Sequence, residues 1–315
     1  MPTEKSETAG YLTCTTKRQV PYQPPHRSRI GLPNLGDTCY VNSAIQCLAH
    51  CTSLNPGLHA LMPPDATMHG TGTIAASERI AAHYWEVIIS GDLNVGHLNL
   101  GNLPNLLLEI RIVHAVDFQK QKQLDAHDAM IWLLQCIKYR TTSVEVDNFG
   151  VNMTESMTCQ VKFCGRYDAL ESDPVKFLSL SLEVPGYNTT LQACLVSFFA
   201  PQERQWRCDE CNQLRPQSVI TSPVGTYQIR CAGFPKFVNL HLKRFKSNAN
   251  GSNTGGNRQR VDFPREKLAF GSVCNCTHSP KPEYNLMLVI QHMTTPGRTE
   301  GHFITIARQT VHQQW

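Results

Sequence analysis

The spacing of apolar residues changes along the chain, and this change constrains the fold more than any other feature of the sequence. In the first half, apolar side chains recur at i, i+3, i+4 and i+7, which is the spacing of a helix with one buried face. Thr38 or Asp37 is expected to cap the first of these helices. Three helices are predicted. The first begins near Cys39, and the other two span roughly residues 76–90 and 125–139.

The second half shows strict alternation of apolar and polar residues, which is typical of half-buried antiparallel strands. A helical half followed by a half made of strands predicts an α+β fold. The cleft between two such lobes is a usual place for a functional site. The alternating segments are residues 178–184, 238–243, 286–290 and 304–306.

The composition is that of a globular protein, with 315 residues, 41% of them hydrophobic and 17% charged. Residues 1–28 are polar and lack periodicity, so we expect a disordered tail there. The net charge of +4 comes from scattered Lys and Arg residues, which argues against a nucleic-acid partner. The sequence shows neither a run of eighteen apolar residues nor a signal peptide. We therefore expect no membrane span and a cytoplasmic or nuclear protein.

One cysteine lies where a nucleophile is expected. Residues 31–48 have the sequence GLPNLGDTCYVNSAIQCL, so Cys39 falls in the first turn of the first predicted helix. The positive end of the helix dipole favours a thiolate there, and Gly36 lets the backbone turn sharply. The amide of Asn34, five residues upstream, can donate a hydrogen bond to an oxyanion. Taken alone, this pattern also fits an ordinary cysteine at the start of a helix.

A thiol nucleophile needs an imidazole that takes its proton and returns it to the leaving group. The chain has 13 histidines, and a single histidine is more often structural than catalytic. His302 is the best candidate, because it follows Gly301 at the start of the last alternating segment.

These segments resemble the sequence boxes of ubiquitin-specific proteases. The first matches GLxNLGNTCYxNSxLQxL, with Asp37 in place of the usual Asn. Residues 284–308 resemble the family's histidine box, in which the GH[YF] histidine is the base, and His292 occupies the box's earlier histidine position. QLDAHD and PKFVNLHLKRF resemble two further boxes, at residues 123–128 and 235–245.

The resemblance covers residues 29–315 and implies a papain-like cysteine protease with a helical thumb, an antiparallel-sheet palm and zinc-tipped fingers. It implies that Cys39 attacks the C-terminal glycine carbonyl of ubiquitin or a ubiquitin-like modifier, with His302 as base and Asn34 at the oxyanion. The carboxylate of Asp125 is expected to bind the arginine-bearing tail of ubiquitin. The implied divisions are a thumb over residues 29–148, fingers mainly over 149–232 and a palm over 233–315.

In the family, a third residue, Asp or Asn, follows an aromatic residue downstream of the histidine and orients it. Trp315 fits that aromatic residue and is the last residue of the sequence. Three alternatives stay open: an incomplete C-terminal end, an enzyme that works with a Cys–His pair, or an inactive ubiquitin-binding pseudoprotease. A zinc-held scaffold for another partner is a further and less favoured alternative.

Two cysteine pairs predict a structural zinc site. Cys208 and Cys211 form a C-x-x-C pair, whose spacing suits a tetrahedral metal. Cys159 and Cys164 form a wider pair, in a segment where the family usually has TCxxCG. Four thiolates would hold Zn²⁺ at the finger tips and leave no open position for catalysis. The alternative is that the four residues are ordinary thiols at a decayed site.

Overall fold

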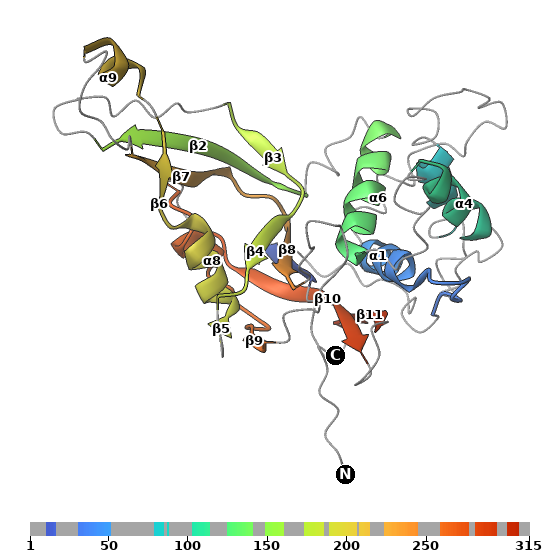
Figure 1. Cartoon of the computed structure of the whole chain (residues 1–315). Helices are drawn as coiled ribbons and strands as arrows, with labels where there is room; N and C mark the ends of the chain where they lie inside the picture. Colours follow the sequence, from blue (N-terminus) through green and yellow to red (C-terminus); the bar gives the residue numbers. More distant parts are fainter. Residues whose placement is uncertain are drawn as a thin grey trace.

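The computed structural model has two lobes, one of helices and one of sheets (Figure 1). Among the residues that it describes, no helix is long and apolar enough to cross a membrane. The described residues are 11–16, 31–51, 79–84, 87, 103–113, 125–140, 149–160, 173–185, 189–206, 208–214, 224–244, 259–276, 281–294 and 301–308.

The helical lobe contains α1 (Cys39–His50), α4 (Leu103–Val113) and α6 (Ala126–Arg140). The helices predicted near Cys39 and over residues 125–139 are confirmed. The one predicted over residues 76–90 is helical where it is described, at residues 79–84 and 87. Helix α4 was not predicted, although its buried residues have the same i, i+3, i+4, i+7 spacing. These residues are Leu103, Leu106, Leu107 and Ile110.

Helix α1 lies at the centre of the first hydrophobic core. Its apolar face packs with residues of α4 and α6, and apolar residues of the sheet lobe join the same cluster. The stacked rings of Phe149 and Phe237, 4.8 Å between centroids, belong to this shared core. The two lobes are therefore joined by a shared, closely packed core.

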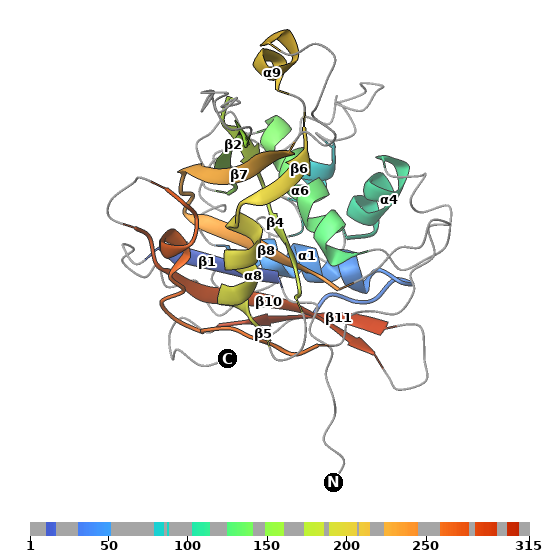
Figure 2. The same cartoon turned by 60° about the vertical axis from the view of Figure 1, so that its left-hand side comes forward.

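A five-stranded sheet forms the base of the second lobe, and Figure 2 shows it from the side. Its strand order is β11-β10-β1-β8-β4. The pair β4–β8 is parallel, with Leu180 opposite Leu240, so the prediction of purely antiparallel strands is wrong for this edge. The chain between the two strands is long enough for the crossover that parallel pairing requires. The strands are β1 (Tyr11–Thr16), β4 (Leu180–Glu183), β8 (Phe237–Lys243), β10 (Tyr284–Thr294) and β11 (Gly301–Ala307).

Strand β1 corrects the prediction that residues 1–28 form a disordered tail. Residues 11–16 lie in the middle of the sheet, antiparallel to β8 on one side and to β10 on the other. Their sequence, YLTCTT, consists largely of residues that favour strands. Six residues are too few to establish a period, and the pairing that stabilises them comes from strands far along the chain.

A second sheet extends from the base, and in both views the short helix α9 (Asp209–Leu214) lies at its far end (Figures 1 and 2). We call this sheet, of order β3-β2-β7-β6, the finger sheet. Burial decreases along β2 towards Cys159, and β6 is exposed along its whole length. The finger tip therefore has little core of its own. The strands are β2 (Val151–Cys159), β3 (Val175–Phe177), β6 (Gln202–Gln205) and β7 (Val224–Gly233).

A second hydrophobic core lies under helix α8 (Leu191–Phe199) and the 3-10 helix η3 (Phe270–Ser272). Phe270 makes edge-on ring contacts with Phe199, Phe234 and Tyr284, at centroid distances of 5.9, 6.0 and 5.7 Å. Such pairs are favourable beyond the apolar area that they bury. The small parallel sheet of β5 (Thr189–Thr190) and β9 (Val261–Asp262) completes this region.

Candidate active site

The loop that leads into α1 contains two consecutive residues in the left-handed region, Gly36 with φ of 83° and Asp37 with φ of 49°. Asp and Asn tolerate this conformation better than other side chains, which accounts for Asp at a position where the family motif has Asn. Thr38 occupies the N-cap position of α1, but no side chain caps the helix. The prediction that Thr38 or Asp37 caps it is therefore wrong.

The side chain of Asn34 is held by the same loop. Its Oδ1 accepts hydrogen bonds from the Thr38 backbone N–H at 3.0 Å and from the Thr38 hydroxyl at 3.1 Å. The Thr38 hydroxyl oxygen in turn accepts from the N–H of Leu35 at 3.0 Å. Because Oδ1 is used, the amide is oriented with Nδ2 as its outward donor. Within the described part of the chain, nothing accepts a hydrogen bond from Nδ2.

Cys39 is the first residue of α1 and is only 4% exposed. The loop before it is anchored from within the helix, because Asn42 Nδ2 donates to the backbone oxygen of Pro33 at 2.9 Å. The backbone N–H of Asn42 also donates to the Thr38 oxygen at 2.8 Å. The position of the Cys39 thiol is thus set by core packing on one side and by a hydrogen-bonded loop on the other.

His302 reaches the same region from β11. Strand β11 packs on α1, and the hydroxyl of Thr305 donates to the backbone oxygen of Ser43 at 2.8 Å. Thr305 lies three residues after His302, and Ser43 lies four residues after Cys39. The imidazole of His302 is exposed and makes no hydrogen bond with any described residue. The predicted base and nucleophile therefore lie at the ends of two elements that are packed together.

The glycine before His302 is required by packing. A Cβ on Gly301 would collide with the ring of His292 and would lie 2.7 Å from the backbone oxygen of Met293. His292 is buried on β10, and its ring lies 4.6 Å from that of Phe303. Met293 and His302 are directly opposite each other in the ladder of β10 and β11. His292 thus packs against the first residue of β11, the strand that carries His302.

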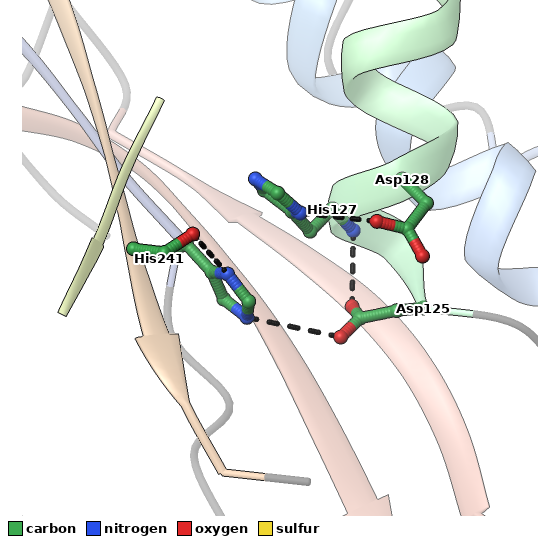
Figure 3. Close-up of polar contacts among 5 residues, drawn as sticks. Asp125, His127, Asp128 and His241 are labelled. Atoms are coloured by element: carbon green, nitrogen blue, oxygen red, sulfur yellow. Dashed lines mark hydrogen bonds and ion pairs between the residues drawn. The ribbon is translucent and has the colours of Figure 1, made fainter. Parts of the chain in front are cut away.

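Asp125 lies at the start of α6, next to a pair of stacked histidines that the sequence did not predict (Figure 3). Its Oδ1 accepts from the backbone N–H of His127 at 3.0 Å, which caps the helix. The rings of His127 and His241 stack at 4.1 Å between centroids. The hydroxyl of Ser181 and Nδ1 of His241 are 3.0 Å apart. The histidine of the HLKRF segment therefore connects strand β8 to the start of α6.

The contact between Asp125 and His241 is not an ion pair at neutral pH. His241 Nε2 and Asp125 Oδ2 are 3.7 Å apart, a distance that a charged pair would allow. Burial lowers the pKa of His241 to about 3, and the charges of His127 and Lys243 act in the same direction. The ring is therefore neutral at pH 7. With its N–H on Nε2, which faces the carboxylate, the neutral ring uses Nδ1 to accept from the hydroxyl of Ser181.

Three of the predicted zinc ligands come together at the finger tip. The sulfur atoms of Cys159, Cys208 and Cys211 all lie within 4.8 Å of one another, and those of Cys159 and Cys211 are 3.7 Å apart. This is too long for a disulfide, whose sulfur atoms are about 2.05 Å apart. Four thiolates around Zn²⁺, at bonds of about 2.3 Å, are separated by about 3.8 Å in a regular tetrahedron. The described thiols therefore fit a tetrahedral metal ion.

Two predicted features fall on parts of the chain that the structure does not describe. Cys164, the expected fourth ligand, lies in residues 161–172, and Trp315 lies in residues 309–315.

The histidine contacts of Asp125 were missed because periodicity does not indicate which strand a helix start will face. The only available indication was that histidines occur in both the QLDAHD and HLKRF segments.

The fold and the site define a papain-like thiol hydrolase, and comparison with known proteins gives the family. The family model described as "Ubiquitin carboxyl-terminal hydrolase" matches residues 30–315. The chain belongs to this family of deubiquitinating cysteine proteases.

Individual relatives are distant. The chain is 24% identical to ubiquitin carboxyl-terminal hydrolase 12 of Salmo salar, over 93% of this chain and 80% of that protein. It is 24% identical to probable ubiquitin carboxyl-terminal hydrolase 4 of Schizosaccharomyces pombe, over 90% of this chain and 52% of that protein. The chain thus spans about half of the second relative's length.

Solved structures confirm the α+β fold. A SAGA DUB module of Ubp8, Sgf11, Sus1 and Sgf73 bound to monoubiquitin matches with a TM-score of 0.67 and 20% identity. A module of the same composition bound to ubiquitin aldehyde matches with a TM-score of 0.64 and 21% identity. Each match covers 93% of this chain, and 64% and 65% of the solved chains. At this identity the likeness establishes the fold.

Proposed function

We propose that this chain is a thiol-dependent deubiquitinating isopeptidase that cleaves after the C-terminal glycine of ubiquitin or a ubiquitin-like modifier. The observation that carries the proposal is the packing of β11 on α1. The hydrogen bond from Thr305 to Ser43, 2.8 Å long, fixes the strand of His302 against the helix that begins with Cys39. Family membership makes ubiquitin conjugates the expected substrates.

Each of the three residues has one chemical task in this proposal. Cys39 Sγ attacks the carbonyl carbon of the terminal glycine, and His302 takes the thiol proton and delivers it to the leaving amine. Asn34 Nδ2 donates to the oxyanion, a task for which its held Oδ1 pre-orients it. A water molecule, deprotonated by His302, then hydrolyses the thioester and releases the modifier and the free thiol.

Asp125 is proposed to bind an arginine in the tail of the modifier. Its carboxylate accepts a hydrogen bond from the His127 N–H and lies beside the neutral ring of His241, yet keeps 20% of its side chain exposed. A carboxylate fixed in this way can accept a bidentate guanidinium with little loss of side-chain freedom.

Zn²⁺ is proposed at the finger tip, held by Cys159, Cys208 and Cys211 with Cys164 as the fourth ligand. The separation of 3.7 Å between Cys159 and Cys211 supports this assignment. With four protein ligands the ion would be structural and would fix the ends of β2 and β7. A cytoplasmic or nuclear location is part of the proposal, because thiols and thiolate-bound metal persist in reducing compartments.

The experiment is covalent labelling with a ubiquitin that carries a C-terminal electrophile. We expect one adduct, mapped to Cys39, and none in Cys39→Ala. Cys47→Ala is the matched control, since Cys47 is a buried cysteine two turns further along the same helix, and it should label normally. Binding of unmodified ubiquitin without labelling of Cys39 would instead identify a pseudoprotease. Labelling that persists in Cys39→Ala would contradict the assignment of the nucleophile.

A further inference from the structure

A second group of three cysteines lies in the core of the sheet lobe. Cys231 is on β7, and Cys274 and Cys276 follow η3. The backbone N–H of Cys231 donates to the backbone oxygen of Cys274 at 3.2 Å. This bond places the two residues side by side in adjacent segments of the chain, which is the arrangement that a disulfide between them requires. Neither the protease mechanism nor the finger-tip metal uses this group.

Cys274 and Cys276 are brought together by the residue between them. Asn275 adopts the left-handed conformation, with φ of 51°. As a result both thiols point to one acceptor, the backbone oxygen of Gly271, with sulfur–oxygen distances of 3.7 Å for Cys274 and 3.9 Å for Cys276. A C-x-C segment in an extended strand would keep its side chains further apart.

Burial changes along the group. Cys276 is partly exposed, whereas Cys274 is 0% and Cys231 is 4% exposed. Both buried residues belong to the second hydrophobic core. An oxidant from solvent therefore meets Cys276 first and has no direct access to the other two.

The middle residue, Cys274, is more acidic than Cys231. Hydrogen bonding from the Cys231 thiol lowers the pKa of Cys274 to about 6, and Cys276 acts in the same direction, against a desolvation that raises it. The same interaction with Cys274 raises the pKa of Cys231. Cys274 thus lies between two thiols, and its interaction with Cys231 favours its deprotonation as it reacts.

Among the described residues, the finger tip is the place where three sulfur atoms are grouped closely enough to hold a metal ion. In the second group, Cys274 interacts with both Cys231 and Cys276, and Cys276 also acts on Cys231. The chemistry that this group offers is therefore reaction between pairs of its sulfur atoms.

We propose that Cys231, Cys274 and Cys276 form a thiol relay, oxidised by hydrogen peroxide through Cys276, whose end product is a disulfide between Cys231 and Cys274. The bond would tie strand β7 of the finger sheet to the segment that precedes β10. Such a link lies away from Cys39. It would change how firmly the finger sheet is attached to the rest of the sheet lobe.

The reaction balances with one peroxide molecule. The Cys276 thiolate attacks a peroxide oxygen, the O–O bond breaks, and hydroxide leaves to give a sulfenic acid. The Cys274 thiolate attacks that sulfur, the S–O bond breaks, and the oxygen leaves as water. The Cys231 thiolate then attacks the Cys274 sulfur and releases Cys276 as a thiolate. Two thiols have lost two electrons and two protons, and the peroxide has become two water molecules.

The test is peptide mapping of the full chain after near-stoichiometric hydrogen peroxide and blocking of residual thiols. Trypsin cleaves after Arg230, Lys236 and Lys267, so Cys231 lies on a short peptide separate from the one with Cys274 and Cys276. We expect these two peptides to be joined, and to separate on treatment with a dithiol reductant. A chain in which Cys231 stays unmodified while the other thiols are oxidised overturns the proposal.

Three variants test the order of the relay. Cys276→Ser should slow formation of the Cys231–Cys274 bond at least about tenfold, because the exposed entry thiol is gone. Cys231→Ser should trap the earlier disulfide within one peptide, between Cys274 and Cys276. Cys194→Ser is the matched control, because Cys194 is a buried cysteine of the same core. This variant should form the Cys231–Cys274 bond at the same rate as the chain without substitutions. An unchanged rate in Cys276→Ser overturns the entry step. The mapping of the chain without substitutions does not depend on any of these variants.

Discussion

Helix α1 and the finger tip each contain cysteines that can function only when they are accurately placed. The chain holds these cysteines in different ways in the two regions. Ten of the twelve residues of α1 are buried, and Cys39 is one of them. At the finger tip Cys159 ends a strand whose burial fades, and β6, at the edge of the same sheet, is exposed throughout. Cys39 is held within the first hydrophobic core. Cys208 and Cys211 are also buried, but they lie at the short helix α9 and belong to neither hydrophobic core.

This difference shows why the two sites respond to different perturbations. A residue held by a core loses its position when a neighbouring volume changes. A residue held by metal coordination loses its position when the metal is removed, and the rest of the molecule is unaffected. The following predictions are ordered from the largest expected effect to the smallest.

Removal of the metal should give the largest effect, and only in the finger sheet. Chelation, or Cys208→Ser, is expected to speed hydrogen exchange in β2 and β7 near the tip by about 100-fold or more, because metal binding and local folding are coupled. Amides of α1 should keep their protection. Cys136→Ala, a change in buried α6, serves as the control and should leave the tip unaffected. Equal loss of protection in α1 and β7 would refute the distinction between the two regions.

A single methyl group should disturb the region that is held by packing. Gly301→Ala places a Cβ against the buried ring of His292 and 2.7 Å from the oxygen of Met293. We expect a loss of about 3 kcal/mol in the free energy of unfolding, measured by denaturant titration, and slower labelling of Cys39. His292→Ala in the same chain should restore part of the loss by removing the ring. If the double variant is no more stable than Gly301→Ala, the collision with His292 is not the cause.

Asn34 allows chemistry and position to be separated. Asn34→Ala should lower turnover of a ubiquitin C-terminal amide reporter by about 100-fold, since one oxyanion donor is lost. Asn34→Asp keeps an oxygen that can accept the two hydrogen bonds that Thr38 donates to Asn34, at 3.0 and 3.1 Å. The substituted side chain has no N–H donor. It should lose as much activity as Asn34→Ala and keep the melting temperature. Full activity in Asn34→Asp would assign Asn34 to the loop alone.

Acid should weaken the contact between α6 and β8 through His241. Its pKa is about 3 in the folded chain and about 6.5 in an unfolded one, so only the unfolded state binds the proton between these values. Stability is therefore complete above pH 6.5 and falls by up to about 1.4 kcal/mol per pH unit as the pH drops towards 3. His241→Gln should reduce this slope, measured by melting at pH 7 and pH 5. His302→Gln, at an exposed histidine, should leave it unchanged.

The sequence predicted those features that depend on short motifs. Cys39, Asn34 and His302 were assigned from local segments, and the structure brings α1 and β11 together. It could not predict that Ser181 and His241 support Asp125, because these contacts join residues far apart in the chain. The parallel pairing of β4 with β8 was missed for the same reason. Alternation identifies a strand, but neither its neighbours nor its direction.

Strand β1 has a consequence for how the protein is made. Tyr11 pairs with Ile290 and with His241, so the middle strand of the base sheet leaves the ribosome well before either of its neighbours. Until β10 emerges, β1 presents an open edge, which is where strands pair wrongly with other chains. Folding dominated by such distant pairs is slow. The nascent chain therefore needs protection from aggregation until β10 has emerged, and the helical lobe can fold well before the sheet closes.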